Sequence, residues 1–520
     1  MTAGQSKGLT HAWRISVFAL IQAGIMLLAI SNESLWIDEF WTAHFGAMPS
    51  FSEFYALLLV PSGSQTPLHF AHFYFWGLLA PSGEFFLRLA NLPLFVAGQL
   101  ALFWAVRTWP LKLSALFLTV SALHPMVWQY ANEARPYIMM YAGAQMMLAC
   151  LLNMHAAGAD ERAADPLFTL FFVVGGILLF GASMLGTFWV FAACVYVLIH
   201  HLRYATWRGL LRVTNLLLVC VFLAAIAALT AYYLSSLLQG AGASRLDSSS
   251  PATVVFAAYE VLGLAGLGPS RLDLRASGAA ALGPYLIGLV VAGGILLSIL
   301  AVGFKAAKAR LGTRELIIVG ALGLFPLAIV LFSGFAMHWR VLGRHLIAAL
   351  PLLNLVLALG LASLLESDGR RGQRLRSLVA PLGLLLLVGS SLSLRFSEQH
   401  RKDDYRSAAA LAQQAIAQGK RVWWAADAVG ANHYRLPGEF DFMGELTGVH
   451  QPVECVDRPG VQSVANMPGD CLRLLSPPDL IILSKPEGYD KTGGLTEYIQ
   501  ARNYAPVQSL PAFTVWRAPG

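Results

Sequence analysis

The sequence contains few charged residues. Only 12% of its 520 residues are Asp, Glu, Lys or Arg, whereas 57% are hydrophobic and the mean hydropathy is +0.60. Soluble globular proteins carry about 25% charged residues, so this composition excludes a chain that is water-exposed throughout. It predicts an α-helical polytopic membrane protein.

Cysteine is also scarce. The chain has five cysteines, which excludes a small disulfide-rich scaffold. Cys150, Cys194 and Cys220 fall in apolar runs and are expected to be small core residues. Cys455 and Cys471 lie near the C-terminus and could pair if that part occupies an oxidising compartment.

Several sequence patterns are missing as well. The basic residues form no patch interleaved with aromatic residues, which argues against a nucleic-acid partner. The last 126 residues contain no phosphate loop, no GxGxxG and no metal-ligand cluster, so no nucleotide or metal site is predicted there. No internal repeat is visible along the chain.

The charges that are present are unevenly distributed. Residues 395–520 hold 13 of the 36 basic and 14 of the 29 acidic side chains. We therefore expect a transmembrane domain over 1–394 and a soluble domain over 395–520. Apolar segments at 421–426, 479–484 and 512–516 predict strands, and periodic segments at 404–418 and 495–502 predict helices, so the soluble domain is expected to be α/β.

Apolar runs predict about eleven transmembrane helices. They lie near 13–31, 85–106, 112–127, 137–157, 167–184, 185–202, 209–234, 281–304, 315–333, 346–365 and 377–394. The run at 67–80 is short and aromatic, and it contains His69 and His72. We expect it to lie at the membrane surface, together with a second helix at 51–60 that is capped by Ser50.

Basic loops predict the orientation. The loops at 107–112, 200–208, 305–314 and 368–376 all face the cytoplasm, with the N-terminus, if 67–80 does not cross. The first run lacks a small-x-small cleavage site before Trp36, so it is expected to be an uncleaved span. The outer face then collects Asp38, Glu39, Glu84, Arg88, residues 132–137, the loop 235–280 with Arg271 and Arg275, residues 338–340, Arg344, His345 and the soluble domain.

The stretch Ser34–Trp41 places two carboxylates, Asp38 and Glu39, among aromatic residues where a membrane helix surfaces. A carboxylate near lipid is costly and therefore indicates a function. The alternative is a helix first turn, where acids interact favourably with the helix dipole. Arginines and histidines on the same face favour a phosphate-bearing ligand.

Six motifs occur in the order found in a known family. They are Trp36-Ile37-Asp38-Glu39, Gln65-Thr66-Pro67-Leu68, Gly83-Glu84 through Arg88 to Pro93, Glu133-Ala134-Arg135-Pro136-Tyr137, Gly343-Arg344-His345 through Pro351, and Asp403-Asp404-Tyr405-Arg406. With these motifs the chain resembles the membrane glycosyltransferases of the GT-C type, which include the protein O-mannosyltransferases, the lipid A aminoarabinose transferase and many bacterial relatives. Glu133 stands where the family often has Asp, and His345 stands where Tyr is common.

The resemblance implies a GT-C fold and an inverting glycosyltransferase of the cell membrane. Such an enzyme moves a sugar from a polyprenyl-phosphate donor to an acceptor hydroxyl on the extracytoplasmic face. Asp38 is the expected base, and Glu39 is the alternative base or an acceptor-orienting residue. Trp36 would either desolvate the carboxylate or anchor the loop at the interface. The residues expected at the donor phosphate are Arg88, Arg135, Arg344, His345 and Arg340.

Other roles stay open. Glu133 is the expected second acid, although it could instead pair internally with Arg135. Gln65 and His69 are candidates for sugar or acceptor contacts. No particular cofactor is predicted. A divalent cation could bind Asp38, Glu39 and Glu133, but no ligand spacing supports one.

The acceptor could be a protein, lipid A or another glycan. A non-enzymatic transporter of lipid or solute is the competing function. It is disfavoured because the charges cluster at one face and no repeat is visible. An inactive sugar-binding subunit with the same fold is the third alternative.

Overall fold

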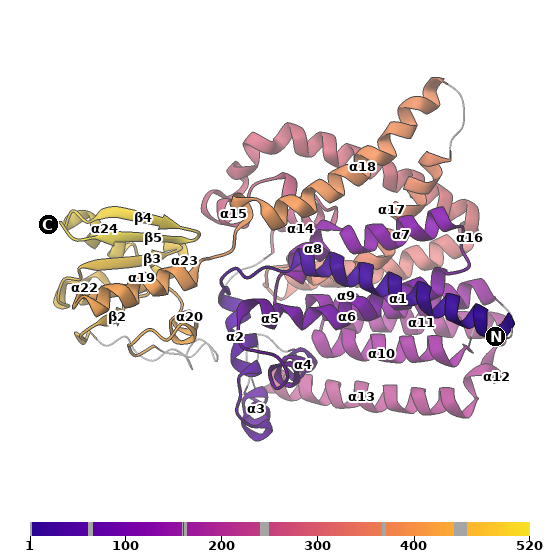
Figure 1. Cartoon of the computed structure of the whole chain (residues 1–520), viewed down its shortest axis with the longest axis horizontal. Helices are drawn as coiled ribbons and strands as arrows, with labels where there is room; N and C mark the ends of the chain where they lie inside the picture. Colours follow the sequence, from indigo (N-terminus) through magenta and orange to yellow (C-terminus); the bar gives the residue numbers. More distant parts are fainter. Residues whose placement is uncertain are drawn as a thin grey trace.

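The computed structural model describes residues 3–60, 66–158, 160, 164–239, 249–366, 371–440 and 455–519. A bundle of long helices forms most of the molecule, and a small five-stranded sheet lies beyond one end of the bundle (Figure 1). The N-terminus lies at the opposite end of the bundle from the sheet (Figure 1). The fold is therefore helical with a C-terminal sheet domain, as the sequence predicts.

The helical part consists of eighteen α-helices within the described residues. They are α1 (Ala3–Ala29), α2 (Ile37–Gly46), α3 (Phe51–Leu58), α4 (Pro67–Gly77), α5 (Glu84–Leu89), α6 (Asn91–Val106), α7 (Leu111–Leu123), α8 (Pro125–Ala131), α9 (Tyr137–Ala157), α10 (Pro166–Ala182), α11 (Gly186–Tyr204), α12 (Trp207–Leu210), α13 (Val213–Leu238), α14 (Pro251–Val261), α15 (Arg271–Ser277), α16 (Leu286–Ala336), α17 (Leu350–Leu365) and α18 (Arg371–Phe396). Short 3-10 helices lie at η2 (Ala265–Leu267), η3 (Gly278–Tyr285), η4 (Gly343–Ala349) and η5 (Glu398–His400).

Seven helices in the described ranges are long and apolar enough to cross a membrane, or eight if α7 and α8 form one bent span. They are Glu84–Val106, Tyr137–Ala157, Gly186–Tyr204, Val213–Leu238, Arg271–Ala336, Gly343–Leu365 and Leu378–Phe396. Trp13–Ala29 and Pro166–Ala182 are apolar but shorter. The expected eleven runs all lie on helices. They outnumber the seven or eight helices of the described residues that are long and apolar enough to cross a membrane.

Two breaks explain part of the difference. The backbone of α16 departs from helical geometry at Gly312, whose φ is 77°, so this element contains both expected runs 281–304 and 315–333. The run at 112–127 is bent by 45° between α7 and α8. His124 precedes Pro125 and has an extended backbone, because the proline ring disfavours helical geometry in the residue before it.

The helices α3 and α4 fall within the ranges 51–60 and 67–80, for which the sequence predicts helices at the membrane surface. The side chain of Ser50 accepts a hydrogen bond from the backbone N–H of Glu53 and caps α3, as predicted. With 11 residues, α4 is about 16 Å long, which is roughly half the thickness of the hydrocarbon core. It is therefore too short to cross.

The sheet domain has the strand order β2-β1-β3-β5-β4. Its elements are α19 (Tyr405–Ala417), β1 (Val422–Ala425), α20 (Ala428–His433), β2 (Val461–Ser463), α22 (Gly469–Leu474), β3 (Leu480–Ser484), α23 (Pro486–Tyr489), α24 (Gly494–Ala501), β4 (Ala505–Leu510) and β5 (Phe513–Arg517). Strands β1, β2 and β3 are parallel, and β5 pairs antiparallel with β3 and β4. The three predicted strands are β1, β3 and β5, whereas β2 and β4 are additional.

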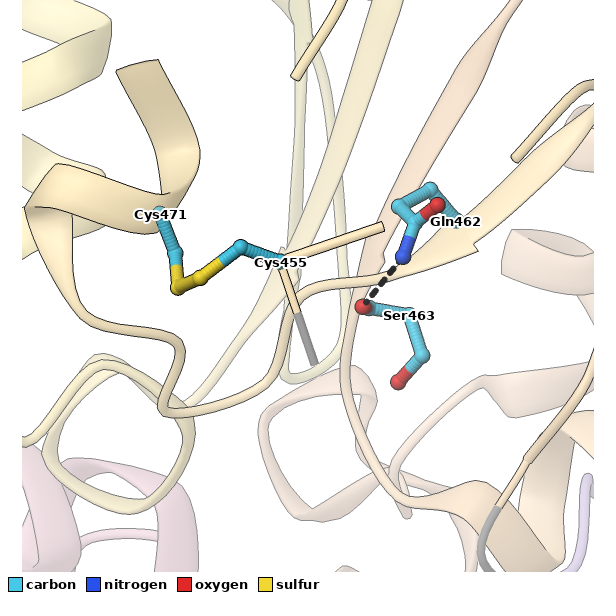
Figure 2. The surroundings of a disulfide bond; sticks show 4 residues. All are labelled: Cys455, Gln462, Ser463 and Cys471. Atoms are coloured by element: carbon cyan, nitrogen blue, oxygen red, sulfur yellow. Dashed lines mark hydrogen bonds between the residues drawn. A yellow bond between two sulfur atoms is a disulfide. The ribbon is translucent and has the colours of Figure 1, made fainter. Parts of the chain in front are cut away.

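A disulfide bond joins Cys455 to Cys471 of α22, which confirms the predicted pair (Figure 2). Figure 2 also shows Gln462 and Ser463 of β2 near this bond. Cys150 is buried as expected, and Cys194 is partly buried. Cys220 is exposed on α13, so its assignment to a core is wrong: an apolar run does not distinguish a lipid-facing position from a buried one.

Candidate active site

A large open cavity of about 2870 Å³ lies between the helical bundle and the sheet domain. Its walls come from α2, the segment 132–137, the loop around α14 and α15, residues 339–345, the linker 400–403 and the strand ends of the sheet domain. Single ligand pockets usually measure about 300–1,000 Å³. The cavity therefore has room for two substrates at once.

Asp38 lines this cavity from the first turn of α2. Its Oδ2 lies 3.5 Å from Nη1 of Arg344 and 3.7 Å from Nη2 of Arg135. The side chain is 27% exposed, and Arg135 also donates to the backbone carbonyl of Asp38 over 3.1 Å. The carboxylate is thus accessible from the cavity and held between two guanidinium groups.

The two arginines keep hydrogen-bonding capacity. Within the described residues, Nε of Arg135 and Nε of Arg344 are buried and have no hydrogen-bond partner. The Arg344 guanidinium lies 5.9 Å from the Trp36 ring and 5.8 Å from the Tyr137 ring, distances typical of cation–π contacts. Aromatic rings therefore fix the position of Arg344 without using its N–H groups.

Glu39 is buried at the centre of a network beside the cavity, and it does not line the cavity. Its carboxylate accepts from Arg88 over 2.8 and 2.9 Å, from the backbone N–H of Ala134 over 2.8 Å and from Lys402 over 3.1 Å. Burial alone would raise the pKa of Glu39, but Arg88, Lys402 and the Ala134 N–H lower it to about 2. This geometry favours a structural role and does not support Glu39 as an alternative base.

Arg88 is fully buried, contrary to its expected position at the donor phosphate. Two of its five N–H groups donate to Glu39. The other three donate to the backbone carbonyls of Ser31, Glu33 and Ser34. No donor remains for a phosphate, so the structure removes Arg88 from the expected binding set.

Glu133 is buried, and its Oε1 accepts from Nη1 of Arg271 over 2.8 Å. Arg271 also donates to Tyr130 over 2.7 Å and lies 3.6 Å from Glu260. Glu133 therefore pairs with Arg271, and Arg135 pairs with Asp38. The alternative of an internal Glu133–Arg135 pair is wrong. The Arg271–Glu260 contact was missed, because α14 and α15 give no sequence signal that they pack together.

His345 and Arg340 line the cavity, as expected of ligand-binding residues. Nδ1 of His345 accepts from the backbone N–H of Leu342 over 3.0 Å. The ring therefore caps η4 and carries its proton on Nε2 in the neutral state. Arg340 is exposed.

His69 is fully buried on α4, and its Nε2 lies 3.1 Å from the hydroxyl of Thr42. Burial, followed by the charges of Arg135 and His72, lowers the pKa of His69 well below its ordinary value. The described residues that line the cavity do not include it, which contradicts its expected substrate contact. Gln65 lies outside the described residues.

A divalent cation has no support in this arrangement. Within the described ranges, no group of three His, Cys, Asp or Glu residues could hold a metal ion. The carboxylates considered for this role face cations of the protein instead: Asp38 faces Arg344, Glu39 faces Arg88 and Glu133 faces Arg271.

The fold has relatives among solved structures, although no family model and no curated protein sequence matches the chain. The apo crystal structure of ArnT from Cupriavidus metallidurans aligns with a TM-score of 0.54 and 15% identity, over 98% of each chain. The chain has an ArnT-like fold. Together with its apolar helices, the ArnT-like fold makes the chain a multi-pass membrane protein.

Two further structures are similar at lower scores. ArnT bound to undecaprenyl phosphate aligns with a TM-score of 0.49 and 13% identity, over 97% of this chain and 98% of ArnT. The arabinofuranosyltransferase AftD from Mycobacteria aligns with a TM-score of 0.41 and 16% identity. That alignment covers 97% of this chain and 40% of AftD. Identities this low establish the ArnT-like fold alone, so the roles of the site residues rest on geometry.

Proposed function

We propose that the protein is an inverting glycosyltransferase that moves a sugar from a polyprenyl-phosphate donor to an acceptor hydroxyl. The observation that carries the proposal is the placement of Asp38 in the cavity between Arg135 and Arg344. The ArnT-like fold supports it, and ArnT itself has been crystallised with undecaprenyl phosphate. The acceptor is a protein, lipid A or another glycan.

The chemistry is a single displacement. Asp38 accepts the proton of the acceptor hydroxyl, whose oxygen attacks the anomeric carbon of the donor sugar. The bond from that carbon to the phosphate oxygen breaks on the opposite side, which inverts the configuration. The proton moves to Asp38 and the electron pair leaves with the phosphate, so no protein nucleophile is needed.

Arg344 and Arg135 are the proposed ligands of the departing phosphate. Its negative charge grows as the bond breaks, and fixed guanidinium groups stabilise that charge in the transition state. Each arginine faces Asp38 through an Nη atom and retains an Nε without a partner in the described part of the chain. Both arginines line the cavity, so a phosphate that enters it meets two guanidinium groups while Asp38 stays in place. Arg340 and His345 line the same cavity and are proposed as further phosphate contacts.

The reaction is proposed to take place on the extracytoplasmic face of the cell membrane. In this arrangement the transmembrane catalytic domain spans 1–394, and the domain 395–520 covers the cavity from outside. The Cys455–Cys471 disulfide supports an oxidising location for that domain. The basic loops support a cytoplasmic N-terminus.

The test uses purified protein in vesicles with a panel of polyprenyl phosphates that carry radiolabelled hexoses or pentoses. We expect protein-dependent release of free polyprenyl phosphate and transfer of the label to one acceptor class. Protein-free vesicles are the control. Movement of the intact donor across the bilayer without cleavage, for every sugar in the panel, would contradict the proposal and favour a transporter.

A further inference from the structure

The linker between α18 and the sheet domain runs beside the loop that carries Asp38. Residues 401–404 form neither helix nor strand. The motif Asp403-Asp404-Tyr405-Arg406 begins here, and the proposed chemistry assigns it no role. The contacts of this motif, and those of Lys402 just before it, join the linker both to the helical part and to the sheet domain.

Lys402 points to the helical part. Its Nζ donates to Oε2 of Glu39 over 3.1 Å and to the backbone carbonyl of Asn132. Glu39 follows Asp38 in α2 and also accepts from the N–H of Ala134. One ammonium group therefore joins the turn that carries Asp38 to the segment that carries Arg135.

Asp403 points to the sheet domain, where it forms an ion pair with Lys485 directly after β3. Both side chains are at least nine-tenths buried. Lys485 has a φ of +39°, which is uncommon for a residue other than glycine and persists only where surrounding contacts hold it. Asp404 caps α19 by accepting from the N–H of Ser407 over 3.0 Å. The sheet domain thus binds the linker at Asp403, one residue after Lys402.

The sheet domain also holds the chain just before α2. The backbone N–H of Arg406 donates to the hydroxyl of Ser34 over 3.1 Å. The hydroxyl of Tyr434 accepts from the N–H of Leu35 over 3.1 Å. The ring of Phe40, in α2, lies 5.2 Å from that of Tyr405. Residues on both sides of Asp38 are therefore fixed by the sheet domain.

We propose that Lys402 is a positioning residue, through which the sheet domain sets the geometry of Asp38 and Arg135. The inference rests on the proposed function for its kinetic consequence. Loss of Lys402 leaves Glu39 paired with Arg88, so the fold persists while the tie to Asn132 disappears. Lys402 then acts on the rate of transfer and not on the affinity for the donor.

The experiment compares Lys402→Met with Lys420→Met, which removes an exposed lysine of the same domain. Misplacement of catalytic groups by about 1 Å can lower a rate about 100-fold. We expect Lys402→Met to lower kcat by about 10- to 100-fold with the Kd for polyprenyl phosphate unchanged. It should lower the Tm by less than Arg88→Gln does, because Glu39 keeps its bidentate partner Arg88. Lys402→Arg should restore part of the rate, because it can donate to both oxygens. Lys420→Met should behave as wild type.

Hydrogen–deuterium exchange provides a readout that does not depend on activity. Backbone amides of residues 34–41 and 130–137 should exchange faster in Lys402→Met than in wild type and Lys420→Met. Unchanged exchange in both segments would overturn the inference. A raised Kd for the donor with unchanged kcat would also overturn it, because Lys402 would then contact substrate directly. If wild type transfers no sugar, the proposed function fails while the exchange result still decides the structural link.

Discussion

Arg344 and Asp38 meet in the cavity with Nη1 and Oδ2 3.5 Å apart. Arg344 belongs to the 3-10 turn before α17, and Asp38 belongs to the first turn of α2. The separation is longer than an ordinary charge-assisted hydrogen bond. Asp38 therefore orients the guanidinium without saturating its hydrogen-bond donors. This relationship makes Arg344 the first residue to test as a phosphate ligand.

Arg344→Ala is expected to weaken polyprenyl-phosphate binding about 10- to 100-fold, because a hydrogen bond to a charged group contributes about 1.5–3 kcal/mol. Arg344→Lys should recover only part of the affinity, since lysine lacks the planar fork of donors. Titration of the lipid in nanodiscs measures the Kd. Arg14→Ala on the exposed surface of α1 is the control. Equal affinity of Arg344→Ala and wild type would remove Arg344 from the phosphate site.

Arg88→Gln is expected to act on stability. It leaves the buried Glu39 without its bidentate partner, and breaking a buried ion pair costs about 3–5 kcal/mol. Thermal unfolding in detergent should show a large fall in Tm. Arg401→Gln, which breaks an exposed pair with Glu398, should change the free energy of unfolding by less than about 1 kcal/mol. An unchanged Tm together with lost donor binding would return Arg88 to the phosphate site.

Glu39 should make stability fall in acid. Its pKa is lowered from 4.5 to about 2 in the folded protein, so its stabilisation is fully present above pH 4.5 and is lost as the pH falls towards 2. Unfolding free energies measured across this range should decrease less steeply in Glu39→Gln than in wild type. Glu53→Gln, at an exposed position on α3, is the control. A wild-type slope in Glu39→Gln would contradict this account.

The orientation can be tested at Ser82, which is exposed between α4 and α5. A cysteine introduced there, after Cys150, Cys194 and Cys220 are replaced by serine, should react with an impermeant reagent in intact cells. The reason is that α4 is too short to cross. A cysteine at Arg310, an exposed position in the basic segment of α16 just before Gly312, should react only after lysis. The reverse pattern would place the cavity on the cytoplasmic face.

The sequence predicts the framework well because apolar runs report directly on burial in lipid. It also places Asp38, Arg135 and Arg344 on one face, since loop charge reports on orientation. Fewer helices than the eleven expected runs are long and apolar enough to span within the described residues. One element holds both runs 281–304 and 315–333, with the break at Gly312 between them, and the run 112–127 bends at Pro125.

The sequence could not separate binding from structural arginines. Arg88 and Arg344 both occur in motifs that the sequence predicts to lie on the outer face, yet only the fold shows that Arg88 donates all its N–H groups to the chain. Lys402 and Glu260 were missed for a related reason, because their partners Glu39 and Arg271 come from other elements. Strand β4 was missed because its residues are nearly all exposed and do not alternate.

Asp38→Asn provides the most direct test of the central claim, that Asp38 is the base. Transfer from a labelled polyprenyl-phosphate sugar is measured for wild type, Asp38→Asn and the control Asp470→Asn, whose side chain is exposed on α22. A general base contributes about 100- to 10,000-fold to a rate, so Asp38→Asn should lose at least about 100-fold in kcat while the donor Kd stays within a fewfold of wild type. Transfer by Asp38→Asn at the wild-type rate would contradict the account.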